Sequence, residues 1–192
     1  MRCQAILAII ALFFSAFTSR ADSVQHGLRV PDGFEVTEYA GSDLANDIFC
    51  MTIDPRGRVT VSGRGYTRIL VDDGNGKAGR AIDFLAGPKD GAMGLMWEGD
   101  SLYVVGDGGL RRYRDGKPDL IRALKTGGEH DAHAMRRGPD GWLYVLCGNM
   151  TRVRGSYAQL PTSPIKRPVA GCVLRRRGLQ GLVRDDRHDR HP

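Results

Sequence analysis

The residues whose types could do chemistry are concentrated between positions 127 and 133. This segment reads Gly-Gly-Glu-His-Asp-Ala-His and carries four ionisable side chains, Glu129, His130, Asp131 and His133, within five positions. Such clustering is costly unless it is used, and carboxylates on both sides of His130 stabilise its protonated ring. An imidazole in this setting suits a general base that accepts a proton near neutral pH. We therefore predict His130 as a catalytic base.

Two other interpretations of this segment remain open. The histidines could serve only as hydrogen-bond partners of neighbouring loops, or the four side chains could bind a metal ion. Along an extended strand His130 and His133 would point to opposite faces, so the metal interpretation requires the segment to coil.

The elements that must position this segment form an internal repeat of about forty residues. Each copy has an apolar strand, a tight turn built on Gly with Pro or Asp, and a second strand, which together predict a hairpin. In the first two copies a third and a fourth strand follow. The hairpins span residues 49–61, 92–104 and 133–145, the third strands 68–72 and 110–114, and the fourth strands 80–85 and 119–124.

Four antiparallel strands per repeat are typical of a β-propeller blade. We predict an all-β protein, a partial β-propeller with about three four-stranded blades of a six-bladed ring. A solenoid of parallel strands is the main structural alternative, but its repeats are usually shorter and lack two-residue hairpin turns. A ring with this many blades is open, which leaves strand edges unprotected.

The repeat also predicts where polar side chains gather. Shifts of 43 and 41 residues superpose Asp47, Asp90 and Asp131, and the same shifts superpose Asn46, Lys89 and His130. Each position directly precedes the first strand of a copy, and in a propeller that strand lines the central channel. We therefore expect these side chains around one pocket at one end of the channel.

Several motifs resemble a known family. His130, followed by Gly-Pro-Asp-Gly at 138–141 and by Leu-Tyr-Val at 143–145, resembles the catalytic-histidine blade of soluble glucose and sorbosone dehydrogenases. The segment 90–95 is similar to their glycine-leucine-leucine-glycine strand. The segments 31–36, 46–48, 128–133 and 138–144 together resemble still more closely the membrane-bound dehydrogenase domain of planctomycete-type bacteria. The resemblance covers roughly residues 30–172.

This resemblance implies an oxidoreductase that uses pyrroloquinoline quinone (PQQ) and calcium to oxidise a small-molecule sugar or alcohol, with an electron-acceptor protein as a further partner. It implies that His130 is the base, that Glu129 or Asp131 orients its ring, and that Lys89 and Asp90 bind the cofactor. In the family, the cofactor-binding arginines and the calcium ligands come from later blades. A non-catalytic propeller that binds a glycan or a protein is the alternative function.

The N-terminus predicts export. A basic start, an apolar run over 5–17 and small residues at Ser19 and Ala21 are typical of a secretory signal peptide, here residues 1–21. The apolar run is shorter than the roughly 20 residues of a membrane helix, so we expect no transmembrane span after cleavage and a periplasmic or secreted protein. Residues 22–172 then form the propeller portion, and 173–192 a basic tail of truncated, out-of-frame or natural origin.

The charge of the chain limits its possible partners, and the cysteine count limits its possible disulfides. The formal net charge of +6 comes with many arginines late in the chain, between 175 and 190, and with no recognition motif, which argues against nucleic acid as a partner. After cleavage Cys50, Cys147 and Cys172 remain, an odd number that allows one disulfide and one free thiol. The sequence leaves their pairing open.

Overall fold

The computed structural model describes residues 23–151 and 171–177. The chain divides into two compact units, Met1–Glu38 and Tyr39–Pro192. In the first unit, β1 (Ser23–Gln25) and β2 (Leu28–Val30) form a short antiparallel hairpin. The predicted signal peptide, and the tail from 178 onward, lie outside the described residues.

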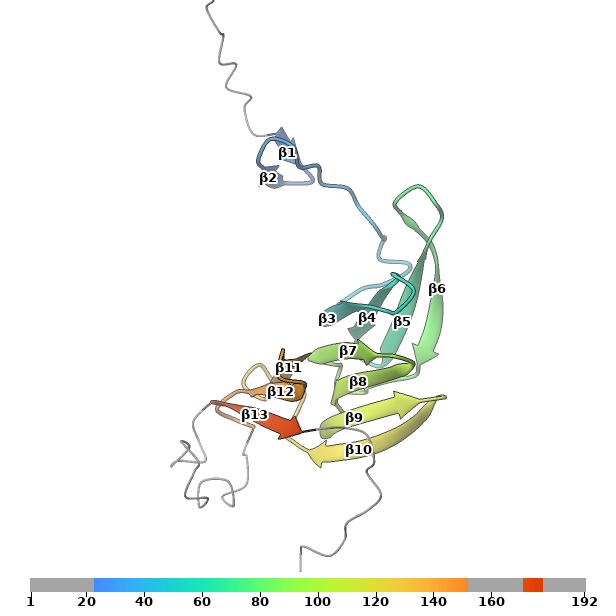
Figure 1. Cartoon of the computed structure of the whole chain (residues 1–192). Coiled ribbons are helices and arrows are strands. Elements are labelled where there is room, and N and C mark those ends of the chain that lie inside the picture. The colour runs from blue at the N-terminus through green and yellow to red at the C-terminus, as the bar shows by residue number, and fades with distance from the viewer. Residues whose placement is uncertain (1–22, 152–170, 178–192) are drawn as a thin grey trace, which may run out of the picture. The chain divides into compact units, whose positions relative to one another are not determined.

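Three antiparallel sheets make up the described part of the second unit, in chain order (Figure 1). The first is β3-β4-β5-β6, with β3 (Cys50–Ile53), β4 (Val59–Gly63), β5 (Tyr66–Asp72) and β6 (Ala78–Leu85). The second is β7-β8-β9-β10, with β7 (Gly94–Glu98), β8 (Ser101–Gly106), β9 (Gly109–Arg114) and β10 (Lys117–Ala123). The third is β11-β12-β13, with β11 (Ala132–Arg137), β12 (Trp142–Cys147) and β13 (Cys172–Arg177).

The all-β class predicted from the repeat is confirmed for the described residues, which contain no helix. The two four-stranded sheets match the predicted strands closely. Accordingly, within 23–151 and 171–177 no helix is long and apolar enough to cross a membrane.

Asp-Gly turns explain why neighbouring strands pair locally. Asp107 and Gly108 connect β8 to β9 with φ values of 46° and 77°, and Asp115 and Gly116 connect β9 to β10 with 51° and 72°. Two consecutive residues with positive φ give the hairpin turn whose twist matches that of paired strands. Aspartate tolerates this region better than most residues and glycine adopts it freely, so the sequence determines these turns directly.

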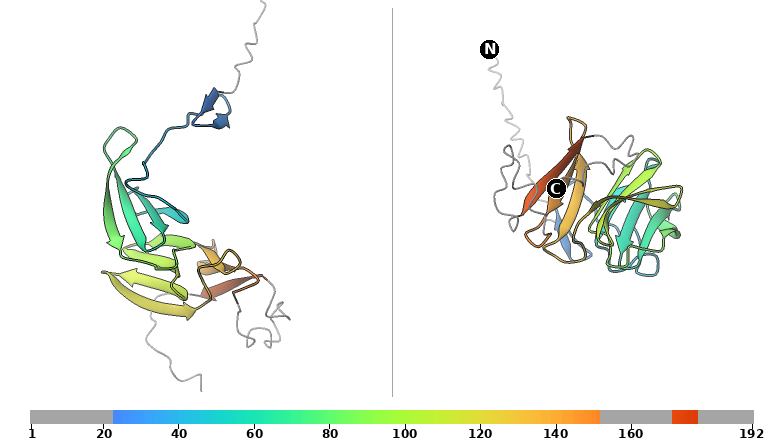
Figure 2. Two further views of the ribbon diagram at one scale, coloured as in Figure 1. Left: turned by 180° about the vertical axis from the view of Figure 1, so that it is seen from behind. Right: turned by 90° about the horizontal axis from the view of Figure 1, so that it is seen from below.

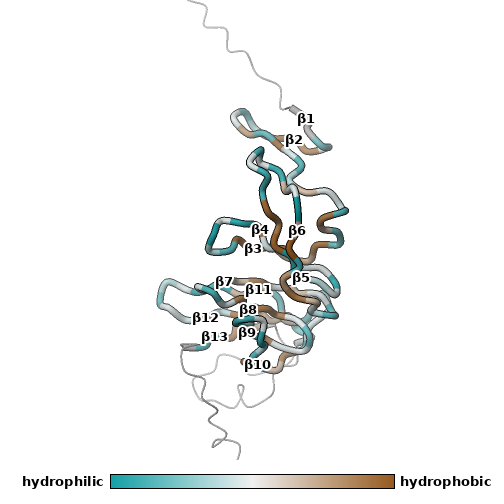
Figure 3. Tube along the Cα trace, turned by 90° about the vertical axis from the view of Figure 1, so that its right-hand side faces the viewer, coloured by the Kyte–Doolittle hydropathy of each residue, from teal (hydrophilic) through white to brown (hydrophobic). Residues whose placement is uncertain are grey.

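The second sheet packs against the first sheet with one face and against the third sheet with its other face (Figure 2). All six residues of β8 are buried: Leu102 and Val104 join a core with the first sheet, while Tyr103 and Val105 join a core with the third. The first strands are neighbours, since β7 packs against both β3 and β11. Apolar residues concentrate in the strands and hydrophilic ones in many of the turns (Figure 3).

The third sheet includes the start of the predicted basic tail. The strand β13 pairs with β12 along its whole length, so the predicted boundary at 172/173 falls inside a strand. Alternation is in fact present, because Cys172 and Leu174 face the core of the second and third sheets while Val173 and Arg175 are exposed. Arg175 stacks over the Trp142 ring at 4.6 Å, which shows how an arginine fits a strand surface.

Candidate functional site

The loops that precede β3, β7 and β11 lie next to one another. Phe49, just before β3, packs on Gly91 so closely that a Cβ at Gly91 would lie 2.5 Å from its ring carbons. Gly127, in the loop before β11, approaches Asp90 in the same way, and a Cβ there would lie 3.0 Å from the Cβ of Asp90. The polar positions that the repeat superposes are therefore carried by adjacent loops.

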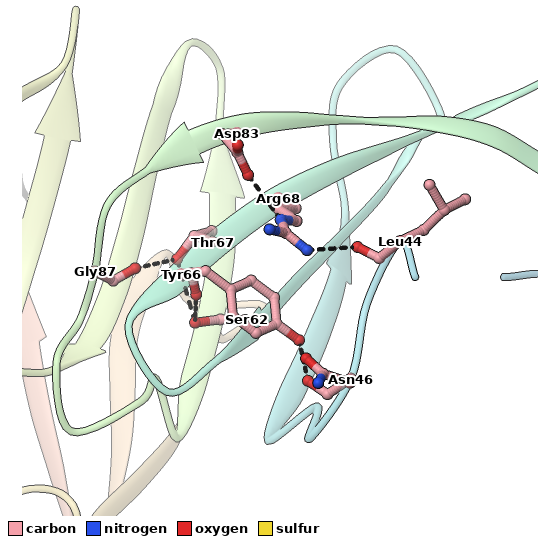
Figure 4. Close-up of polar contacts among 8 residues, drawn as sticks. All are labelled: Leu44, Asn46, Ser62, Tyr66, Thr67, Arg68, Asp83 and Gly87. Carbon is pink, nitrogen blue, oxygen red and sulfur yellow. Dashed lines mark hydrogen bonds and ion pairs between the residues drawn. The ribbon is translucent and has the colours of Figure 1, made fainter. Parts of the chain in front are cut away.

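The loop before β3 is fixed by the first sheet itself (Figure 4). The Tyr66 hydroxyl donates to the Asn46 carbonyl, and Arg68 Nη1 donates to the Leu44 carbonyl at 2.9 Å. Arg68 Nε also donates to Asp83 at 2.7 Å, which holds the guanidinium in place. Because Tyr66 and Arg68 bond main-chain carbonyls of the loop before β3, the backbone of that loop is held in one position.

The loop before β7 is fixed by Asp90. Its Oδ1 accepts from the Asp107 amide at 2.6 Å and its Oδ2 accepts from the Thr126 hydroxyl. In return, Asp107 Oδ1 accepts from the Lys89 amide at 2.6 Å and from the Asp90 amide at 3.3 Å. Asp90 therefore clamps its own loop to the β8–β9 turn and to the loop before β11. Its carboxylate is engaged in these hydrogen bonds, and the Lys89 side chain is exposed.

The loop before β11 is fixed by Asp131, which is 1% exposed. Its Oδ2 accepts from the Gly128 amide at 2.9 Å, and its Oδ1 forms an ion pair with Lys125 Nζ at 3.0 Å. Gly128 and Asp131 also close a tight turn, since the Asp131 amide donates to the Gly128 carbonyl at 3.0 Å. The partners of this carboxylate among the described residues are thus the Gly128 amide and Lys125, and it holds the turn. Its charge is balanced by Lys125.

Both histidines line one open hollow, which we call the histidine hollow, with a volume of about 430 Å³. Its lining residues are Glu129, His130, His133, Leu146, Cys147, Gly148, Asn149, Gly171, Cys172 and Val173. The turn at 128–131 brings His130 and His133 to the same hollow, so the opposite-face geometry expected for an extended strand does not apply.

The two histidines have different partners. His133 Nε2 donates to the Glu129 carbonyl at 2.5 Å, a structural bond across the turn. The His130 side chain is exposed, and its ring has no hydrogen-bond partner among the residues that the structure describes. Its main chain is well held, because its carbonyl accepts from the Met150 amide at 2.8 Å. Within the described part of the chain, His130 therefore offers an unpaired imidazole on a fixed backbone.

Sequence reasoning missed Asp107 and Lys125 in this region, and it left the pairing of Cys147 and Cys172 open. The Asp-Gly pair at 107–108 was a usable signal, because it marks a turn between two strands. Lys125 and the two cysteines had no local signal, since their partners are brought close only by the pairing of strands and loops.

The described residues contain no side-chain cluster for the calcium that the resemblance implies. Calcium requires six to eight oxygen ligands, and within 23–151 and 171–177 no group of three or more His, Cys, Asp or Glu side chains could hold a metal ion. The metal-ligand interpretation of the 129–133 cluster has the same difficulty. For the quinone, Lys89 has an exposed side chain with no ion-pair partner in the segments 23–151 and 171–177, while Asp90 holds hydrogen bonds within the loops.

Comparisons with known proteins give little further guidance. No family model matches the chain, and no curated protein matches it. Among solved structures, the chain is similar to the extracellular domain of a hybrid two-component system from B. thetaiotaomicron, with 14% identity and a TM-score of 0.31. That likeness covers 57% of this chain and 20% of the other, so this chain spans about a fifth of that domain.

Proposed function

We propose that the three sheets are consecutive blades of a partial β-propeller, and that the chain is part of an exported quinone-dependent sugar or alcohol dehydrogenase in which His130 is the base. The observation that carries this proposal is the state of His130. Its ring is unpaired within the described residues and lines an open hollow, while the turn that bears it is fixed by Asp131 and His133.

The blade interpretation is supported by the order of the sheets. Each sheet is antiparallel, the strands within each follow chain order, and the first strands β3, β7 and β11 are neighbours. In a propeller these first strands line the channel, and the loops before them surround its mouth. The adjacency of the loops at Phe49, Asp90 and Gly127 agrees with that arrangement.

As a base, His130 would accept the proton of a substrate hydroxyl at a ring nitrogen. A general base must hold its geometry, and here the tight turn and the His130 carbonyl bond supply rigidity while the ring remains accessible. A bound quinone would supply the acceptor for the hydride. Lys89 is the described residue suited to a quinone carboxylate, and calcium ligands would have to come from outside the described residues.

The test is reconstitution of the full chain with pyrroloquinoline quinone and calcium, followed by dye reduction with aldoses. We expect measurable turnover, which His130→Gln should lower by about 10²- to 10⁴-fold, because that is the usual contribution of a general base. His133→Gln is the matched control, since glutamine retains a donor for the Glu129 carbonyl and should cost far less. Absence of turnover, or a larger loss in His133→Gln, would contradict the proposal.

A second candidate is a non-catalytic propeller that binds a glycan or a protein. The specific observation in its favour is that Asp90 and Asp131, two of the expected site carboxylates, are engaged in holding loops. Such a module needs the fixed loops but no base. Glycan binding by the chain without quinone, equal in wild type and His130→Gln, together with no dye reduction, would favour this function.

A further inference from the structure

Two cysteines face each other across the third sheet. In the register of β12 and β13, Cys147 is directly opposite Cys172. Residues directly opposite in an antiparallel pair have Cα atoms roughly 4.5–5.5 Å apart, and their side chains lie on the same face. Disulfides need Cα atoms about 4.4–6.8 Å apart. The register therefore places this pair within the separation that a disulfide requires.

The two side chains share one environment. Both pack in the core that the second and third sheets share. Cys50 is in a different place, on β3 in the core of the first and second sheets, where its thiol donates to the Ala92 carbonyl at 3.0 Å. The strand register therefore pairs Cys147 with Cys172, whereas Cys50 lies in a different core.

We propose that Cys147 and Cys172 form a disulfide that joins β13 to β12 in the wall of the histidine hollow, and that Cys50 stays reduced. The proposal is independent of the catalytic one, since it requires only the strand register and a disulfide oxidant. In the described part of the chain β13 pairs only with β12. The bond therefore holds the last strand of this sheet, β13, on β12, from which it is far apart in the sequence.

The chemistry is thiol–disulfide exchange with a disulfide-bearing oxidant, such as glutathione disulfide. Cys172 is the more exposed thiol and reacts first: its thiolate attacks one sulfur of the oxidant, and one glutathione thiolate leaves. Cys147 then attacks the Cys172 sulfur of the mixed disulfide, and the second glutathione leaves. Two protein thiols are oxidised, one disulfide is reduced to two thiols, and the two protons pass to the departing glutathiones.

Accessibility and pH should control the rate. Both cysteines line the open hollow, so a small disulfide can reach the pair. Burial raises the pKa of Cys147 to about 12 and also raises the pKa of Cys172. Since the thiolate is the nucleophile, we expect slow exchange at neutral pH and a rate that rises about tenfold per pH unit up to at least about pH 9.

The experiment uses the full chain, purified reduced, equilibrated with glutathione disulfide, alkylated and digested with trypsin. The expected product joins the peptides 138–152 and 167–175, while peptide 30–56 carries alkylated Cys50. Cys50→Ser is the matched control and should keep the cross-link, whereas Cys147→Ser and Cys172→Ser should each lose it. If either serine variant fails to fold, the digest of the wild-type protein still identifies which cysteines are joined.

Two outcomes would overturn the proposal: a cross-link that includes Cys50, or glutathione retained on Cys172 with Cys147 still free in excess oxidant. Amide hydrogen exchange tests the structural consequence. Reduction of the wild-type disulfide should speed exchange in β13 by about tenfold or more, because the strand loses its covalent attachment to β12. Unchanged exchange would show that the bond does not secure β13.

Discussion

At the scale of single residues, the site depends on side chains and backbone atoms that hold the histidine turn. Asp131 is buried against Lys125 and the Gly128 amide, and His133 bonds the Glu129 carbonyl. The least conspicuous contributor is Gly148. Its amide donates to the Asp131 carbonyl at 2.8 Å, and the position its Cβ would occupy is already filled by the His130 carbonyl.

Gly148→Ala should therefore destabilise the protein by about 1 to 3 kcal/mol, the usual cost of overpacking, and should displace the turn that carries His130. Gly171→Ala is the matched control in the same hollow, because a Cβ there would meet its nearest atom at an ordinary 3.4 Å. Its effect should stay within about 0.5 kcal/mol. Denaturant midpoints of both variants measure the difference, and equal midpoints would contradict the close packing at Gly148.

At the scale of elements, Asp54 organises the β3–β4 hairpin. Its buried carboxylate accepts from the amides of Arg56 and Arg58 at 2.9 and 2.8 Å, and it pairs with the Arg58 guanidinium at 2.6 Å. Burial raises the pKa of Asp54, but the hydrogen bonds and charge of Arg58, with the Arg56 amide, outweigh it and leave the pKa lowered.

A lowered pKa in the folded state means that Asp54 stabilises the protein fully above its unfolded pKa of about 3.9, and that this contribution is lost as the pH falls through the lower folded value. Asp54→Asn should cost about 1 to 3 kcal/mol at pH 7 and should flatten the loss of stability below about pH 4. Asp115→Asn, a charge change in an exposed turn, is the control. The measurement is the urea midpoint of each protein across pH 2–7. If the stability of both variants fell with acid as in the wild type, Asp54 would not have this role.

At the scale of the whole molecule, the first and third sheets each keep an outer face with exposed apolar side chains. Met51 and Ile53 on β3 are 57% and 51% exposed, and Leu146 and Val173 on the third sheet are 52% and 53% exposed. In a closed propeller such faces would pack against further blades. Within the described residues each outer sheet has a neighbouring sheet on one side only.

We expect this arrangement to unfold with low cooperativity. The two tryptophans report on different sheets, Trp97 on the second and Trp142 on the third, so Trp97→Phe and Trp142→Phe leave one reporter each. Urea transitions should be broad, with midpoints that differ between the two proteins, because in the described structure the second sheet packs on both faces and the third sheet on one. A sharp, coincident transition at a monomeric scattering mass would contradict the open arrangement.

The sequence by itself determined the strands and most turns, because strand alternation and Asp-Gly pairs act over a few residues. It also predicted, through the repeat, that Asp90 and His130 belong to corresponding loops. Only the tertiary structure decided what those side chains do. Asp90 meets Asp107 and Thr126, Asp131 meets Lys125, and Cys147 meets Cys172. Most of these contacts join different loops or strands, and chain folding brings their partners together with no local pattern to mark them.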